Sequence, residues 1–151
     1  MGEAIVTATE ATVTSDVQAI ASEAFATLNT GRQVSPFSTR FPAFDLGAAY
    51  RVTAAVRQMR QVSGEQPVGR KIGFTNRTIW DEYQVYAPMW GYVYDQTTHE
   101  LAGIGETFSL AGLAEPRIEP EVIFRLAAAP APDMDEAALL ACIDAVAHGF
   151  E

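Results

Sequence analysis

Apolar residues recur at helical spacing near the start of the chain. From Thr14 to Leu28 they lie three and four positions apart, and Gly31 follows. This pattern predicts a surface helix with one buried stripe, which Thr14 or Ser15 would cap and Gly31 would end. The preceding residues, 1–13, have no such period and are expected to form a flexible tail.

A second amphipathic segment follows residues 32–44, which contain two prolines and no period and are expected to form a loop. Asp45 is the expected N-cap of the helix, and Ser63-Gly64 its expected end. The predicted buried stripe consists of Leu46, Ala49, Tyr50, Thr53 and Val56, whereas Arg51, Arg57 and Arg60 are expected to face water.

After Pro67 the pattern changes to short β-like segments. The expected strands are residues 68–74, 91–94, 106–110 and 118–126, with one or two helical turns at 78–83. Asp133 and Glu136 have the spacing of a capping box, so a last helix is predicted from there through Val146, and residues 147–151 resemble the start of another strand. Two helices followed by strands and one late helix indicate an α+β fold.

Composition narrows the classes of function. The 151 residues, 48% of them hydrophobic, suffice for one domain with a core. A formal charge of -9 disfavours binding to nucleic acid or to an anionic membrane surface, and no apolar window is long enough to span a bilayer. The one cysteine, Cys142, lies in an apolar run and is expected to be a buried, inert thiol. Because the N-terminus also lacks the pattern of a signal peptide, we expect a cytoplasmic protein.

Two glutamates stand out in the segment RIEPEVIF. In an extended strand Glu119 and Glu121 project to the same face, where their carboxylates repel unless a cation lies between them. Carboxylate ligands suit hard divalent cations such as Mg²⁺ or Mn²⁺. Pro120 cannot donate a hydrogen bond, so the strand should be an edge strand or bulged. On the pattern alone, a solvated edge strand is the more common explanation.

Lys71, in the segment GRKIGFT, is the second candidate for chemistry. It lies mid-strand among small or apolar neighbours, where a lysine can donate a proton or bind a carboxylate, although most strand lysines point to water. Arg70 must face the opposite side, so one of the two should point inward. His99 and His148 lack metal-ligand spacing, and there is no nucleophile elbow, P-loop or dinucleotide-binding fingerprint.

Four motifs occur in one order along the chain: GRKIGFTNR, APMWGYVYD, RIEPEVIFRL and AHGFE. Together they resemble the 2-keto-4-pentenoate hydratase and 2-oxo-hexenedioate decarboxylase group of the fumarylacetoacetate hydrolase superfamily, from about Asp16 onward. The resemblance implies N-terminal helices followed by a mixed β-roll. It divides the chain into a tail (1–13), a helical region (14–66) and the first part of a catalytic roll (67–151), which is expected to be incomplete at the C-terminus.

The resemblance also implies a site. Its metal ligands would be Glu119, Glu121 and Glu151, holding Mg²⁺ or Mn²⁺, and Lys71 would lie beside the substrate and assist proton transfer. The implied activity is hydration or decarboxylation of a small 2-oxo or 2-hydroxydienoic acid in aromatic ring-cleavage catabolism, with the metal chelating the 2-oxo and carboxylate oxygens. A homo-oligomer is also expected.

The chain departs from the family pattern at one residue and in length. Met89 stands where hydratases of the group often have an acid, and Asp95 is a candidate substitute. The family also continues well beyond the third ligand. Two alternatives therefore remain open: carbon-carbon hydrolysis of an acylpyruvate-type substrate, and a truncated, non-catalytic piece that associates with itself or with a partner chain.

Overall fold

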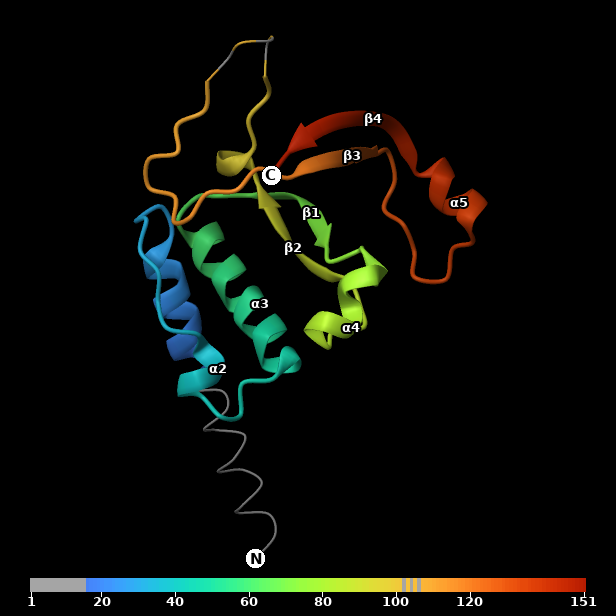
Figure 1. Cartoon of the computed structure of the whole chain (residues 1–151). Coiled ribbons are helices and arrows are strands. Elements are labelled where there is room, and N and C mark those ends of the chain that lie inside the picture. The colour runs from blue at the N-terminus through green and yellow to red at the C-terminus, as the bar shows by residue number, and fades with distance from the viewer. Residues whose placement is uncertain (1–15, 102, 104, 106) are drawn as a thin grey trace, which may run out of the picture. The chain divides into compact units, whose positions relative to one another are not determined.

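The computed structural model describes residues 16–101, 103, 105 and 107–151. The chain divides into two compact units with a boundary between Ala114 and Glu115, called here unit 1 and unit 2. The expected tail at 1–13, the candidate caps Thr14 and Ser15, and the first residue of the expected strand 106–110 lie outside the described residues. Each unit combines helix and antiparallel sheet, in agreement with a mixed fold (Figure 1).

Unit 1 begins with helical segments close to those expected. Residues 16–27 are helical, and α3 spans Leu46–Val62. Asp45 caps α3 as predicted, because its Oδ1 accepts a hydrogen bond from the Ala48 N–H at 2.7 Å. The predicted end is also confirmed: Ser63 is the C-cap, and Gly64 follows with φ 95°. Residues 32–44 were expected to be loop, but they contain the one-turn helix α2, Phe37–Arg40.

The core of unit 1 lies between the helical segment 16–27 and α3. Ile20 and Ala21 are buried against Val52, and the surrounding partly buried residues are Val17, Phe37, Phe41, Phe44, Ala55, Val56 and Met59. The predicted stripe of α3 was therefore wrong in part. Ala48 and Val52 are buried, whereas Leu46 is 63% exposed. The side of α3 that packs on the first helix lies next to the predicted stripe.

A hairpin follows the helices of unit 1. Strand β1, Pro67–Gly73, pairs antiparallel with β2, Met89–Tyr94, and the connection contains two short helical turns, η1 (Arg77–Ile79) and α4 (Trp80–Tyr83). Both strands and the helical turn were predicted. Figure 1 shows α3 running alongside this hairpin. Residues 107–110, expected to belong to a strand, are irregular.

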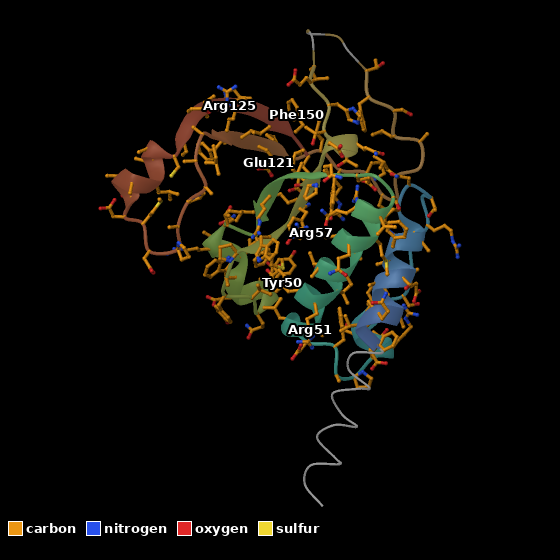
Figure 2. All side chains as sticks on the ribbon, turned by 180° about the vertical axis from the view of Figure 1, so that it is seen from behind. Tyr50, Arg51, Arg57, Glu121, Arg125 and Phe150 are labelled. Atoms are coloured by element: carbon orange, nitrogen blue, oxygen red, sulfur yellow. The ribbon has the colours of Figure 1, made fainter. Side chains whose placement is uncertain are left out.

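Arginines of α3 lie against aromatic rings of β2 instead of facing water. The Arg57 guanidinium lies 5.0 Å from the Tyr92 ring centroid, and that of Arg60 lies 3.7 Å from the Tyr94 centroid. Figure 2 shows Arg57 between α3 and the strands. Arg60 also forms an ion pair with Glu65, whose side chain is 14% exposed. Arg57 and Arg60 were expected to face water, and this expectation was wrong. Long arginine side chains can also pack their guanidinium groups on aromatic rings.

Two glycines join distant segments of unit 1. The Gly31 N–H donates to the Gly112 carbonyl oxygen at 2.8 Å. Gly31 and Gly112 both have positive φ, of 66° and 84°. A Cβ at Gly112 would lie 2.9 Å from the carbonyl oxygen of Asn29, so only glycine allows the two backbones to approach this closely.

Unit 2 is a second hairpin with a short helix in its connection. Strand β3, Pro120–Leu126, pairs antiparallel with β4, Ile143–Phe150, and α5 spans Glu136–Ala141. The helix predicted through Val146 was thus too long, because residues 143–146 belong to β4. Its N-cap is Asp135, which accepts from the Ala138 N–H at 2.8 Å, and not Asp133. Cys142, which ends α5, is buried as expected.

The longest helix in the described part of the chain is α3, with 17 residues. No described helix combines the length and apolar character needed to cross a membrane.

Candidate functional site

Three glutamates are directed to one face of the β3–β4 hairpin. Glu119 and Glu151, just beyond the strand ends, exchange two backbone hydrogen bonds of 2.8 and 2.9 Å, each N–H donating to the other carbonyl oxygen. Glu121 lies two residues along β3, opposite Gly149. Residues directly opposite each other in an antiparallel pair, and residues two apart on one strand, point to the same side. The register therefore gives Glu119, Glu121 and Glu151 a common face.

The opposite face of the hairpin is largely apolar. Its members alternate with the glutamates along both strands, in the register that pairs 120 with 150, 122 with 148 and 124 with 146. They are Pro120, Val122, Phe124, Val146, His148 and Phe150. Figure 2 labels Glu121 and Phe150, one from each strand and each face. The hairpin is thus amphipathic, with most of its large apolar side chains on the face opposite the carboxylates.

The glutamate face has the donor chemistry of a divalent cation site. Directly opposite Cβ atoms in such a ladder lie about 4.5–5.5 Å apart, and residues two apart on one strand about 6–7 Å. Three carboxylates at these spacings repel one another and suit a hard cation. Among the described residues, no three His, Cys, Asp or Glu side chains are grouped closely enough to hold a metal. The residue types and the register fit a metal site. To form it, the three glutamate carboxylates would need to move closer to one another than they are in this structure.

Arg125 forms an ion pair with Asp144, which is not one of these glutamates. Its Nε donates to Asp144 Oδ1 at 2.8 Å, and its Nη2 donates to Oδ2 at 3.2 Å. This hydrogen-bonded ion pair lowers the pKa of the Asp144 carboxyl group.

Lys71 lies on the glycine-rich face of the β1–β2 hairpin in unit 1. It pairs with Gly91, and its neighbours two positions away on β1 are Gly69 and Gly73. A Cβ at Gly91 would lie 3.4 Å from Lys71 Cε and 3.6 Å from Cγ, so the lysine stem runs across this glycine. The residue is exposed. Strand glycines around a reactive side chain leave room for a ligand to approach the backbone.

Arg70 faces the other way, as the alternation of the strand predicts. Its guanidinium lies 4.5 Å from the Trp90 centroid and 5.3 Å from that of Tyr92. Of these two residues, Arg70 is on the face that α3 contacts, where Tyr50 stacks on Trp90, but Arg70 remains exposed. The expectation that one of the two points inward is therefore met in direction and not in burial. Lys71 is left on the open face.

Known proteins resemble this chain in sequence and in fold. It is 30% identical over 125 residues to 2-hydroxyhexa-2,4-dienoate hydratase of Comamonas testosteroni, a match that covers 82% of the chain and 47% of the relative. It is 32% identical over 92 residues to 2-keto-4-pentenoate hydratase of Burkholderia vietnamiensis, covering 61% of the chain and 34% of the relative. Over most of its length the chain therefore resembles the 2-keto-4-pentenoate hydratases.

The fold resembles that of one solved decarboxylase. The structure of 4-oxalocrotonate decarboxylase from Pseudomonas putida G7 with calcium and acetate matches with a TM-score of 0.74 and 24% identity, over 87% of this chain and 50% of that one. Its complex with magnesium and adipate matches with a TM-score of 0.71 and 23% identity, over 87% and 49%. No family model matches the chain. The chain spans about half the length of the first curated relative.

The residue that departs from the hydratase pattern, Met89, lies at the start of β2, and its candidate substitute, Asp95, lies just after that strand. Met89 opens β2 opposite Gly73 and is exposed. Asp95, considered as a substitute acid, follows β2, and its Oδ1 accepts from the Gln66 and Gln96 N–H groups at 2.8 Å each. Asp95 therefore has a structural role in closing the β1–β2 hairpin.

One pair of residues beside the glutamates was not anticipated from the sequence. Ile123, two residues beyond Glu121 on β3, extends its side chain over Gly149 of β4. Apolar residues run without a break from Val122 to Phe124. The two-residue period of the strand places Ile123 on the face of Glu119 and Glu121, but its contact with Gly149 depends on the pairing of β3 with β4, which the sequence does not reveal.

Proposed function

We propose that the chain is part of a divalent-metal-dependent hydratase or decarboxylase that acts on a small 2-oxo or 2-hydroxydienoic acid in the breakdown of aromatic compounds. The observation that carries the proposal is the common face of Glu119, Glu121 and Glu151 on one hairpin. The curated hydratases, which the chain resembles at 30% and 32% identity, support the substrate class. The single cysteine, Cys142, is compatible with a cytoplasmic enzyme.

In this proposal the three glutamates hold Mg²⁺ or Mn²⁺. The neighbouring decarboxylase structures contain calcium and magnesium, which supports a hard divalent cation with oxygen ligands. When bound, the cation supplies Lewis acidity toward a chelating 2-oxo acid. The glutamates orient it, with Glu119 and Glu151 fixed relative to each other by their two backbone hydrogen bonds.

We assign Lys71 to proton transfer. Its ammonium group can donate a proton to a substrate carbon or oxygen, or bind a substrate carboxylate. The glycines at 69, 73 and 91 support this assignment, because they leave the face around Lys71 open. Each of the three candidate reactions, hydration, decarboxylation and carbon-carbon hydrolysis, would use a 2-oxo acid that chelates the cation, so the same three glutamates would serve each of them.

A thermal-shift titration with MgCl₂ or MnCl₂ tests the metal site. A ligand at one hundred times its Kd stabilises the folded state by about 2.7 kcal/mol, which raises the melting temperature of a chain of this size by several degrees. Glu119→Gln and Glu121→Gln should lose most of this shift. Glu100→Gln is the matched control, since Glu100 is exposed in an irregular segment of unit 1. Equal shifts in all three variants, or none in the parent, would contradict the proposal.

Substrate tests separate the candidate reactions. The chain is incubated with 2-hydroxypenta-2,4-dienoate and, separately, with 2-oxo-3-hexenedioate, while the ultraviolet absorbance of the conjugated acid is followed. Loss of absorbance with the first substrate supports a hydratase, and release of CO₂ from the second supports a decarboxylase. Cleavage of an acylpyruvate instead would support the hydrolase alternative.

A second candidate function is self-association without catalysis, and the apolar face of the β3–β4 hairpin favours it. Val122, Phe124, Val146 and Phe150 are all exposed there, and contiguous exposed apolar surface often marks a site of association. The occupant we propose is a second copy of the chain, which would make it a homo-oligomer. Light scattering after size exclusion should give a mass above that of the 16.3 kDa chain. A monomer that lacks metal binding would contradict both candidates.

A further inference from the structure

Ile123 and Gly149 are interlocked on the glutamate face of the β3–β4 hairpin. A Cβ built on Gly149 would lie 2.3 Å from Ile123 Cδ1 and 3.2 Å from Cγ1. Gly149 is the residue opposite Glu121, and Ile123 is two residues beyond Glu121 on the same strand. The δ-methyl group of Ile123 therefore occupies the place where a side chain opposite Glu121 would otherwise lie.

This arrangement is unusual for a face that carries charge. The same face contains Glu121 and Arg125 of β3 and Glu119 just before the strand, and the large apolar residues Val122 and Phe124 belong to the other face. Ile123 nevertheless remains 50% exposed. Glycine in a strand interior is also unfavourable, because it weakens the strand and contributes no packing. A half-exposed isoleucine lying over a strand glycine thus indicates a purpose other than the stability of the hairpin.

The geometry points to a contact with ligand. We propose that Ile123, laid flat across Gly149, is a specificity-determining residue that contacts the hydrocarbon part of a 2-oxo acid whose polar end would bind the divalent cation proposed at Glu119, Glu121 and Glu151. The inference rests on the proposed metal site. Residues two apart on a strand are about 6–7 Å apart, which is the reach of a few methylene groups from a chelating head group. The proposed ligand is accordingly a 2-oxo acid with an apolar chain. Its affinity should depend on the length of that chain through the contact with Ile123.

Binding measurements with two ligands test the contact. Pyruvate and 2-oxohexanoate share the chelating group and differ in chain length, and their affinities for the Mg²⁺-loaded chain are measured by calorimetry. In the parent, 2-oxohexanoate should bind more tightly than pyruvate, by about fourfold for each methylene group that becomes buried. In Ile123→Ala this preference should fall about tenfold, whereas the affinities for Mg²⁺ and pyruvate stay unchanged.

Val122→Ala is the matched control, because Val122 is 58% exposed, adjacent in sequence and on the other face. It should keep the chain-length preference. Gly149→Ala should lose the preference, because its methyl group must displace the Ile123 side chain. In the Ile123→Ala background, Gly149→Ala should have no further effect on the preference, since the δ-methyl group that it displaces is absent.

The outcomes separate the inference from the proposed function. Mg²⁺ binding with a chain-length preference that Ile123→Ala and Gly149→Ala leave intact would overturn the role of Ile123 and keep the metal site. An equal loss in Val122→Ala would also overturn it. A parent chain that binds no Mg²⁺ would overturn the metal site and the inference together.

Discussion

Tyr94 illustrates how burial changes the chemistry of a single side chain. It lies at the end of β2, is buried, and has the Arg60 guanidinium 3.7 Å from its ring centroid. Burial raises the pKa of its phenol above the ordinary value of 10.0, and the nearby positive charge of Arg60 opposes this in part. The native state therefore retains this proton at a pH at which the unfolded chain has begun to lose it.

The raised pKa of Tyr94 predicts alkaline destabilisation. Below pH 10 both states are protonated, and the contribution of the neutral phenol to stability is fully present. As the pH rises from 10 toward the folded-state pKa, the unfolded state loses its proton first, so the free energy of unfolding should fall. Urea denaturation between pH 8 and pH 11 measures this, with Tyr94→Phe as the comparison. A variant whose stability falls as steeply as that of the parent would contradict the assignment.

Single residues also show where prediction from sequence reaches its limit. The common face of Glu119 and Glu121 follows from the two-residue period of a strand and needs no tertiary information. Glu151 is different, because only the pairing of β3 with β4 brings it opposite Glu119. Arg57 and Arg60 were expected to face water. This prediction failed because the polarity of a residue in a sequence does not reveal that an aromatic ring lies within its reach.

At the scale of elements, local signals bounded α3 correctly but misplaced both ends of the last helix. Asp45 and Ser63-Gly64 bounded α3 correctly because capping groups act within one turn. The last helix was predicted to run to Val146, but α5 ends at Ala141. Residues 143–150 instead pair with β3, and this non-local ladder outweighs the weak helical period of the segment.

The cap of α5 gives a prediction at this scale. Asp135→Ala removes the bond to the Ala138 N–H and should destabilise the helix by roughly 1 kcal/mol. Asp133→Ala is the control, because Asp133 has the capping-box spacing in sequence and does not cap the helix in the structure. Hydrogen exchange of the amides of residues 136–142 should speed up in the first variant and stay unchanged in the second. The reverse result would restore Asp133 as the cap.

At the scale of the whole molecule, the two units differ in how many hydrophobic side chains each of them buries. Unit 1 has a core in which Ile20, Ala21 and Val52 are buried between helices. In unit 2, Cys142 is the buried hydrophobic residue among those described, and a two-stranded hairpin is at best marginally stable by itself. The two units should therefore open with different free energies.

Hydrogen exchange of the intact chain tests this difference. Amides in the β3–β4 ladder should exchange roughly tenfold or more faster than those in the middle of α3, after correction for intrinsic rates. The reason is that local opening of the hairpin exposes little new apolar surface. Equal protection in both regions would indicate a single cooperative unit.

The backbone hydrogen bond between Gly31 and Gly112 determines where the chain should tolerate insertions and deletions. It ties the segment after β2 to the turn that follows the first helix, and thereby divides one long connection into two shorter loops. Because the entropy of closing a loop grows slowly with its length, an insertion beside Glu100 should be tolerated. An insertion at Gly112 would move the one residue that permits the close backbone approach. Natural variation in length should therefore collect on either side of Gly112 and spare the glycine itself.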